Sequence, residues 1–364
     1  MKTIMLVFGT RPEAIKMCPL VNELKTRKTV RTVVCVSGQH RQMLDTVLET
    51  FRVIPDYDLS VMKTGQTLFD VTSNILLGIG DVLDEAKPDV VLVHGDTSTA
   101  FAAALACFYK KIPVGHVEAG LRTYNVDSPY PEEFNRRAIG IVARYHFAPT
   151  ALSGGNLLNE GKDPSSVYIT GNTAIDALQT TVRKDYRHPE LDWARDSRLI
   201  MITAHRRENL GEPMRRMFRA IRRVMDDHPD VKAIYPIHMN PAVRRAAKET
   251  LDGCDRIHMI EPLDVIAFHN FLARSFMILT DSGGVQEEAP SLGKPVLVMR
   301  DTTERPEGIR AGTLKLVGTD EQVIYDNFRL LLEDRAVYES MSEASNPYGD
   351  GLACKRIADI LTQI

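Results

Sequence analysis

Short runs of apolar residues, rich in Val and Ile, recur along the whole chain and alternate with longer amphipathic segments. The runs are nearly continuous rather than alternating in polarity, which is typical of parallel strands covered by helices on both faces. The predicted strands are residues 3–8, 32–36, 89–96, 113–120, 145–149, 167–171, 199–205, 232–238, 256–261, 276–282, 295–300 and 314–318. Because strands that alternate with helices form βαβ units, the predicted fold class is α/β with doubly wound sheets.

A polar stretch at residues 180–197 separates the first six predicted strands from the other six. With 364 residues, the chain exceeds the size at which a single hydrophobic core usually keeps growing. We therefore expect two Rossmann-like domains, residues 1–171 and 172–349, which face each other across a cleft.

Ligands of open α/β sheets bind outside the carboxyl ends of the strands, so the residues that follow each strand are informative. Ionisable residues gather at these positions in both halves of the chain. They are Arg11, Asp96 and Glu118 in the first half, and 205–208, His238, Glu261, Asp281 and Arg300 in the second. This concentration predicts a polar site at the strand ends.

The carboxylates of the first half have structural as well as functional interpretations. Asp96 precedes a run of hydroxyl residues, so it could cap the next helix, and this alternative stays open. Glu118 follows a buried strand and is less easily explained as a cap. Glu132 and Glu133 stand in a first helical turn, where carboxylates interact favourably with the helix dipole. For these two, the pattern alone favours a structural role.

The histidines and cysteines do not indicate a metal site. His205 and His238 each follow an apolar strand, and a lone histidine there is more often structural than catalytic; their spacing is not that of a metal pair. The five cysteines are far apart and form no C-x-x-C, which suits a reducing cytosol and offers no zinc site. We expect no bound metal.

The stretch TDSGGVQEEAP, residues 280–290, is the strongest local signal. Ser282-Gly283-Gly284 directly after a strand allows backbone N–H groups to approach an anion at a helix N-terminus. One turn later, either Glu287 or Glu288 could accept hydrogen bonds from ribose hydroxyls. With Arg11 and Lys16 as nearby cations, the pattern predicts a site for a sugar diphosphate.

Composition and charge narrow the possible functions. Hydrophobic residues make up 44% and charged residues 26%, which is ordinary for a globular enzyme. A net charge of −3 argues against nucleic-acid binding. Neither familiar cofactor loop, G-x-G-x-x-G or G-x-x-x-x-G-K-[ST], occurs. The apolar run at residues 4–8 is too short for a signal peptide, and no window predicts a membrane span, so we expect a cytoplasmic protein.

A set of longer motifs extends in order from residue 8 to residue 351. They are FGTRPEAIK, GQHRQML, VHGDT, GHVEAGLRT, PEEFNRR, ITGNTAID, TAHRREN, PIHMNP, LTDSGGVQEEAPSLGKPVLVMRDTTERPE and NPYGDG. With these motifs, the sequence closely resembles the bacterial non-hydrolysing UDP-N-acetylglucosamine 2-epimerases. The stretch from 279 to 307 is the most specific of them.

The resemblance implies a glycosyltransferase-B-like architecture in which a C-terminal helix, residues 350–364, packs back on the first domain. It implies reversible epimerisation of UDP-N-acetylglucosamine to UDP-N-acetylmannosamine, without a cofactor, for cell-surface polysaccharide synthesis. Members eliminate UDP across C1–C2 to give 2-acetamidoglucal, and then add UDP back. A homodimer is also implied.

The resemblance further implies roles for individual residues. The catalytic candidates are Asp96, Glu118, Glu132 and, at the leaving diphosphate, His205; all of them except Glu132 are also substrate-binding positions. The other substrate-binding positions are Arg11, Lys16, Ser282, Gly283, Gly284, Glu288 and Arg305, with Leu263 and Phe268 at the uracil. A second, activating UDP-N-acetylglucosamine would contact Gln39, Gln42, Arg206 and His238. The chain departs from the pattern at Gly65, where some members carry a basic residue.

Other functions remain compatible with the same fold, because a fold alone does not fix a reaction. A UDP-sugar-dependent glycosyltransferase would need an acceptor, whereas an epimerase converts its substrate alone. A hydrolysing relative would release free N-acetylmannosamine, and a nucleotide-sugar sensor would bind without turnover. The presence of all three carboxylates and His205 argues against the sensor. The sequence does not say which carboxylate acts on which face of the sugar.

Overall fold

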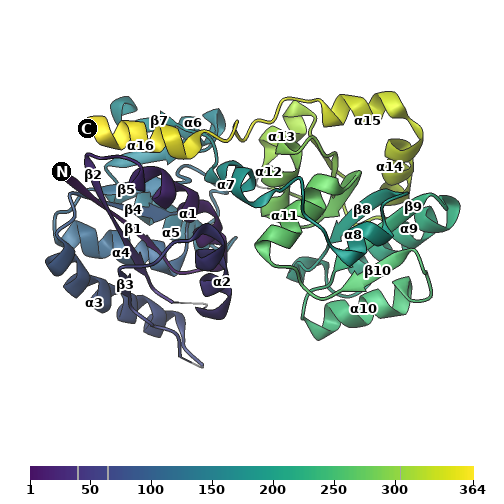
Figure 1. The fold of residues 1–364 in the computed structure, drawn as a ribbon, viewed down its shortest axis with the longest axis horizontal. Coiled ribbons are helices and arrows are strands. Elements are labelled where there is room, and N and C mark those ends of the chain that lie inside the picture. The colour runs from purple at the N-terminus through teal and green to yellow at the C-terminus, as the bar shows by residue number, and fades with distance from the viewer. Residues whose placement is uncertain (39–40, 64, 304) are drawn as a thin grey trace. The chain divides into compact units, whose positions relative to one another are not determined.

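The computed structural model of the protein describes residues 1–38, 41–63, 65–303 and 305–364. The chain divides into two compact units (Figure 1). Unit 1 comprises Met1–Thr180 and Tyr348–Ile364, and unit 2 comprises Thr181–Pro347.

Within its described residues, unit 1 contains a parallel sheet of seven strands in the order β3-β2-β1-β4-β5-β6-β7. The strands are β1 (Lys2–Phe8), β2 (Val30–Val36), β3 (Tyr57–Asp58), β4 (Val90–His94), β5 (Val114–Val117), β6 (Tyr145–Ala148) and β7 (Val167–Ile169). The six strands predicted for this half are confirmed. The strand β3 was missed because two residues are too short to show a pattern.

The helices of unit 1 cover its sheet on both faces, as expected for a doubly wound fold (Figure 1). They are α1 (Arg11–Lys25), α2 (Arg41–Phe51), α3 (Leu68–Ala86), α4 (Ser98–Tyr109), α5 (Glu132–Val142), α6 (Ala151–Asn159), α7 (Thr173–Thr181), α16 (Ala353–Gln363) and the 3₁₀ turn Pro164–Ser166.

Unit 2 has a parallel sheet of six strands across its described residues, in the order β10-β9-β8-β11-β12-β13. The strands are β8 (Arg198–Thr203), β9 (Val231–Pro236), β10 (Ile257–Ile260), β11 (Met277–Thr280), β12 (Val296–Val298) and β13 (Leu314–Leu316), all of them predicted. The helices are α8 (Pro189–Trp193), α9 (Glu212–Asp227), α10 (Pro241–Leu251), α11 (Val265–Arg274), α12 (Gly283–Ser291), α13 (Pro306–Ala311), α14 (Glu321–Glu333), α15 (Arg335–Ser342) and the 3₁₀ turn Arg207–Asn209.

The strand order reverses beside the central strand of each sheet, between β1 and β4 in unit 1 and between β8 and β11 in unit 2. The central strands are buried on both faces: residues 4–8 of β1 are fully buried, which explains their continuous apolar pattern. Loops after the reversing strands diverge at their carboxyl ends, where open α/β sheets hold their ligands. Among the described helices, none is long and apolar enough to cross a membrane.

The division between the units falls at Thr180–Thr181, at the end of α7, rather than at the expected position 171–172. The side chain of Asp176 on α7 accepts hydrogen bonds from the backbone N–H groups of Ala353 (3.2 Å) and Cys354 (2.8 Å). These bonds tie α7 to the start of α16, which lies against α1 in unit 1 (Figure 1). The helix therefore stays with unit 1.

Candidate functional site

Glu118 follows β5 in unit 1 and has an unusual backbone conformation. Its φ is 62°, a left-handed value that non-glycine residues rarely adopt and that often marks functional sites. The carboxylate forms an ion pair with Nζ of Lys16, and both side chains are 11% exposed. Nδ2 of Asn172 lies 3.5 Å from the same oxygen, and Nε2 of His94 lies 3.6 Å from it. The predicted residues Lys16 and Glu118 are thus brought together.

Asp96 does not cap the helix that follows β4. Thr97 is the N-cap of α4, since its side chain accepts a hydrogen bond from the backbone N–H of Ala100. The Asp96 carboxylate instead pairs with Arg136 of α5, whose Nε donates to Oδ2 at 3.1 Å. The capping alternative left open by the sequence is therefore wrong for Asp96.

Arg136 was not among the predicted site residues, although it organises two carboxylates. Its guanidinium is largely buried and bonds both Asp96 and, through Nη1 at 3.2 Å, Oε2 of Glu133. Burial lowers the pKa of this guanidinium, but the neighbouring carboxylates outweigh burial and the net pKa is raised. The only signal in the sequence was the spacing of Glu133 and Arg136, one turn apart at the start of a helix.

The adjacent residues Glu132 and Glu133 have different environments. Glu133 is fully buried and accepts hydrogen bonds from the backbone N–H groups of Thr123 and Tyr124, each at 3.0 Å. In Glu132, the oxygen Oε2 is buried and has no hydrogen-bond partner among the described residues. A buried carboxylate oxygen without a partner is costly, so it indicates a group held ready for a ligand or a proton. Glu133 is structural, whereas Glu132 remains a catalytic candidate.

The loop after β1 is held by a buried carboxylate. Glu13 accepts hydrogen bonds from the backbone N–H groups of Gly9 (2.9 Å) and Thr10 (2.8 Å) and from the hydroxyl of Thr97 (2.6 Å). Burial raises the pKa of Glu13. These bonds join the loops after β1 and β4, and they fix the start of α1, where the half-buried Arg11 is the first residue.

Three buried histidines occupy adjacent strands at this end of the unit 1 sheet. His94 ends β4, His116 is in β5 and His146 is in β6; the pairing of the strands places His116 beside His146. Burial lowers the pKa of His94 to about 4, that of His116 to about 3 and that of His146 to about 4. All three rings are therefore neutral at pH 7.

Asp281 connects the loops after β11 and β8 in unit 2. It is fully buried, and its carboxylate accepts hydrogen bonds from the backbone N–H groups of His205 (2.9 Å) and Arg206 (2.9 Å) and from Nδ2 of Asn209 (3.2 Å). The ring of His205 is partly exposed, with Nδ1 3.7 Å from Oδ1 of Asp281. Burial lowers the pKa of His205, and the nearby Asp281 opposes this effect. His205 is thus held in place by its backbone.

The predicted activator residues are only partly described. The rings of His205 and His238 stack with centroids 5.2 Å apart and planes inclined by 14°. Nε of Arg206 donates to the backbone oxygen of Asp281 at 3.2 Å. His205, Arg206 and His238 therefore lie together at the carboxyl ends of the paired strands β8 and β9. Gln39 and the side chain of Gln42 lie outside the described residues.

The N-terminus of α12 is the position at which the sequence predicts an anion site. Ser282 is the N-cap, and its side chain makes no capping hydrogen bond to the helix. The guanidinium of Arg305 lies against Gly283: a Cβ at this position would be 2.7 Å from Nη1. Nε of Arg305 donates to Oε1 of Glu287 at 2.6 Å, which holds the guanidinium in this place. Backbone N–H groups and a guanidinium at one helix end can bind a phosphate group.

The other predicted residues of unit 2 surround α12. Because Glu287 is paired with Arg305, Glu288 is the better candidate for accepting hydrogen bonds from a ribose. Glu288 is 9% exposed, and its Oε2 lies 3.6 Å from Nε2 of His269. The half-buried side chains of Leu263 and Phe268 pack against the core cluster below α12. They leave part of their apolar surface accessible to a ligand.

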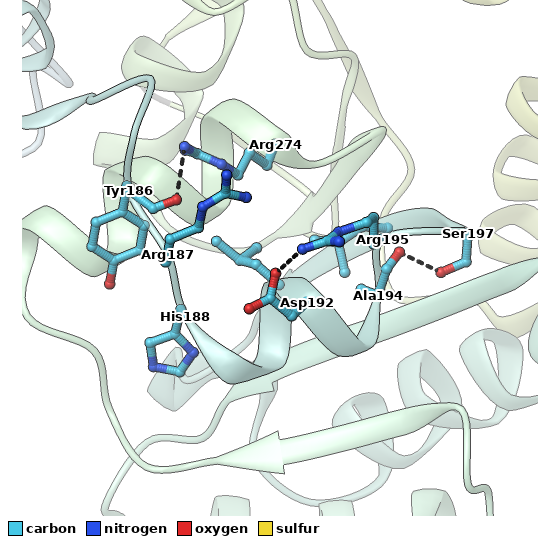
Figure 2. Close-up of a pocket in the computed structure, with 10 residues that line it drawn as sticks. Tyr186, Arg187, His188, Asp192, Ala194, Arg195, Ser197 and Arg274 are labelled. Atoms are coloured by element: carbon cyan, nitrogen blue, oxygen red, sulfur yellow. Dashed lines mark hydrogen bonds and ion pairs between the residues drawn. The ribbon is translucent and has the colours of Figure 1, made fainter.

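A pocket of about 260 Å³ in unit 2 contains none of the predicted residues (Figure 2). Its charged groups are largely satisfied within the protein: Arg195 pairs with Asp192, and Arg274 donates to backbone oxygens that include that of Tyr186. We therefore place the candidate site at the strand ends and not at this pocket. Within the described ranges, no group of three or more His, Cys, Asp or Glu residues is arranged to hold a metal ion.

A family profile, related sequences and solved structures all match the chain to the same family. The family profile described as UDP-N-acetylglucosamine 2-epimerase matches residues 22–362. The UDP-N-acetylglucosamine 2-epimerase of Bacillus subtilis is 60% identical over 358 residues, which cover 98% of this chain and 94% of the relative. A Listeria monocytogenes crystal structure provisionally assigned to the same activity has a TM-score of 0.95 and 54% identity, covering 100% of this chain and 96% of the other. The UDP-GlcNAc 2-epimerase of Neisseria meningitidis bound to UDP-GlcNAc has a TM-score of 0.92 and 48% identity, with full coverage of both chains.

Proposed function

The chain belongs to the UDP-N-acetylglucosamine 2-epimerase family and is an isomerase, and we propose that it acts by eliminating UDP and adding it back. The substrate pair is UDP-N-acetylglucosamine and UDP-N-acetylmannosamine, with UDP as the transient leaving group, and the sugar is not hydrolysed. The observation that carries the proposal is the presence, within unit 1, of a buried oxygen of Glu132 without a described hydrogen-bond partner and of two carboxylates, Asp96 and Glu118, each held by a cation.

The chemistry explains why a leaving group is needed. No carbonyl flanks the C2 proton of the sugar, so direct deprotonation at C2 is too difficult. In the proposed step, a carboxylate takes the C2 proton, the C1–O bond breaks, and its electron pair leaves with UDP. The product, 2-acetamidoglucal, is protonated at C2 on the other face while UDP adds back to C1. After one turnover the group that took the C2 proton is protonated and the group that gave a proton is ionised, so both exchange protons with water before the next turnover in the same direction.

We assign the proton transfers to the carboxylates of unit 1. Glu132 has a buried oxygen without a partner in the described structure, which suits a group that exchanges protons with a substrate. Asp96 and Glu118 are held by Arg136 and Lys16, so they are placed to stabilise positive charge at the sugar carbon. Which carboxylate serves which face of the sugar is left open by this assignment.

We assign the diphosphate to the N-terminus of α12. The N–H groups that follow Ser282, together with Arg305, would stabilise the charge that builds on UDP as the bond breaks. His205 would add to this stabilisation. Glu288 would accept hydrogen bonds from the ribose, and Leu263 and Phe268 would contact the uracil.

The deciding experiment is incubation of the purified protein with UDP-N-acetylglucosamine in deuterated water, followed by proton NMR. We expect loss of the C2 proton signal and the appearance of UDP-N-acetylmannosamine, with no acceptor present. Release of free N-acetylmannosamine would instead indicate a hydrolase. Turnover that needs an added acceptor would indicate a glycosyltransferase, and either result would overturn the proposal.

We predict that Gly283→Ala weakens UDP binding by at least about tenfold. The new methyl group would be 2.7 Å from Nη1 of Arg305, so the guanidinium must move away from the N-terminus of α12. Gly284→Ala is the matched control for this displacement, because its methyl group meets no described atom closer than 3.9 Å. Isothermal titration calorimetry with UDP measures both. Equal affinities for Gly283→Ala and the parent protein would contradict the assigned role of Arg305.

We propose that Arg206 and His238 contribute to a second nucleotide-sugar site, which would make the enzyme responsive to its own substrate. Support comes from their position beside His205 and Asp281, at the strand ends of unit 2. The departure at Gly65 removes one cation that some members carry there. A sigmoidal dependence of rate on UDP-N-acetylglucosamine that becomes hyperbolic in His238→Ala would support the second site.

We also propose that the protein is a homodimer and that unit 1 carries the interface. A hollow of about 620 Å³ on unit 1 is lined largely by apolar side chains of α3, α4 and α5. Phe69 is 86% exposed and Phe134 is 51% exposed, and exposed apolar patches of this kind mark contact surfaces. A second copy of the chain is the partner that the family resemblance implies.

The predicted effect of Phe69→Glu is dissociation of this dimer, with a dissociation constant raised by about tenfold or more, because a charge would enter an apolar interface. Ile54→Glu serves as the control, since Ile54 is 79% exposed but does not line the hollow. Light scattering coupled to size-exclusion chromatography reports the mass of each variant. A dimer that is equally stable in both variants would place the interface elsewhere.

We propose a cytoplasmic location and a role in supplying UDP-N-acetylmannosamine for cell-surface polysaccharide. The cysteine pattern, with no C-x-x-C and wide spacing, supports a reducing compartment. Fractionation of cells that express the tagged protein would test the location. Loss of N-acetylmannosamine from surface polymers after deletion of the encoding sequence would test the role.

A further inference from the structure

His269, on α11, lies between two elements that are far apart in the sequence. Its ring is 1% exposed. Nδ1 is 2.7 Å from the hydroxyl oxygen of Thr181, and Nε2 is 3.6 Å from Oε2 of Glu288. The two nitrogens of one buried ring thus face the first residue of unit 2 and the carboxylate of α12 that we assign to ribose.

The contact with Thr181 fits either tautomer of the ring, and the nearby carboxylate of Glu288 favours one of them. If the Thr181 hydroxyl donates to Nδ1, the proton of the neutral ring is on Nε2 and points to the carboxylate of Glu288. The opposite tautomer would turn a lone pair toward that carboxylate, which is unfavourable. The separation of 3.6 Å is longer than a hydrogen bond, but such contacts often shorten when a ligand is bound.

Thr181 is itself held firmly by α11. Nδ2 of Asn270 donates to the backbone oxygen of Thr181 at 2.7 Å, and Oδ1 of Asn270 accepts from the backbone N–H of Arg183 at 2.9 Å. One turn later, Arg274 donates to the backbone oxygens of Arg183 (2.8 Å) and Tyr186 (3.2 Å), the second of which is drawn in Figure 2. The segment that enters unit 2 is therefore fixed on the same helix as His269.

We propose that His269 is a positioning residue for nucleotide binding: held by Thr181, it orients Glu288 to accept hydrogen bonds from the ribose hydroxyls of the nucleoside diphosphate. The inference rests on the proposed function, in which Glu288 contacts the ribose. It deepens that function by assigning part of the ribose specificity to two residues that do not touch the nucleotide. The hydroxyl of Thr181 then affects affinity from the boundary between the units.

The test compares two ligands, UDP and 2′,3′-dideoxy-UDP, by calorimetry on the full chain. The dissociation constant of the dideoxy nucleotide divided by that of UDP measures what the ribose hydroxyls contribute to affinity. His269→Asn places an amide near the position of Nδ1 and keeps the Thr181 contact, but it no longer reaches Glu288. His269→Gln does the reverse. Thr181→Val removes the hydroxyl at nearly constant volume, and Thr181→Ser keeps it.

We expect His269→Asn to weaken UDP binding by about tenfold, the effect of one hydrogen bond to a charged group, while binding of the dideoxy nucleotide stays unchanged. Thr181→Val should lower the same ratio by a smaller factor, and Thr181→Ser should restore it. A merely structural role would weaken the two ligands equally and leave the ratio unchanged.

Two results would overturn the inference. The first is a parental ratio in both His269→Asn and Thr181→Val, whether or not both ligands lose affinity to the same extent. If Glu288→Gln still lowers the ratio, the assignment of Glu288 to ribose stands and only the positioning role fails. The second is a parental ratio in Glu288→Gln, which would remove the ribose assignment and the inference together.

Discussion

Replacing Glu132 by glutamine is expected to lower kcat for epimerisation by about 100- to 10,000-fold, the usual contribution of a general acid or base. Glutamine has nearly the same shape, but it cannot take up or release a proton at this position. Because Oε2 of Glu132 makes no hydrogen bond within the described structure, the exchange removes no internal contact of that atom. The thermal midpoint should therefore change little, and UDP should bind to unit 2 as before.

The neighbouring variant Glu133→Gln is the matched control, with the opposite pattern expected. Glu133 is fully buried and bonded to two backbone N–H groups and to Arg136, so its exchange should destabilise unit 1 by about 3 kcal/mol or more. Single-turnover rates, deuterium incorporation at C2 and thermal unfolding distinguish the two variants. Full C2 exchange in Glu132→Gln would rule out its role in proton transfer.

The second large effect is a loss of stability in mild acid, caused by the buried histidines of unit 1. The folded-state pKa values of His94, His116 and His146 are about 4, 3 and 4, below the ordinary value of 6.5. As the pH falls below 6.5, the unfolded chain therefore binds protons that the folded chain does not. Each histidine lowers the free energy of unfolding by about 1.4 kcal/mol per pH unit, until the pH reaches its folded pKa.

Urea unfolding, followed by circular dichroism between pH 7.5 and pH 4.5, measures this slope. In the variant His146→Leu, the slope of the free energy of unfolding against pH should be smaller by about 1.4 kcal/mol per pH unit, because one titrating ring is removed. Glu13 acts in the other direction, since its raised pKa favours proton binding by the folded state, so the difference between the two proteins is the decisive quantity. The same slope in both proteins would show that His146 is not buried in its neutral form.

Much of the fold could be predicted from the sequence because the central strands are buried on both faces. Continuous apolar runs then mark each strand without ambiguity, as in residues 4–8. The strand β3 could not be predicted, because two residues carry no periodic signal. The boundary between the units was also misplaced, since it depends on contacts between Asp176 and a helix at the far end of the chain.

Candidate site residues were easier to identify than their partners. Strand ends locate Asp96 and Glu118 directly, but they do not show that Arg136, in a later helix, holds Asp96. The helical pattern alone cannot separate Glu132 from Glu133, which the family resemblance distinguishes, because the different surroundings of two successive helix residues depend on the fold. Likewise, the position of His269 between Thr181 and Glu288 depends on three separate elements and has no local pattern.

The return of the C-terminal helix to unit 1 has a consequence for synthesis of the protein. The buried face of α16, which includes Ile357 and Leu361, lies against α1, a helix that is synthesised long before it. Unit 2 is one continuous segment, so it can fold before α16 is made. Unit 1 must wait for α16 before its core is closed, although most of it is synthesised before unit 2. Truncation before α16 would therefore damage the unit whose synthesis starts earlier.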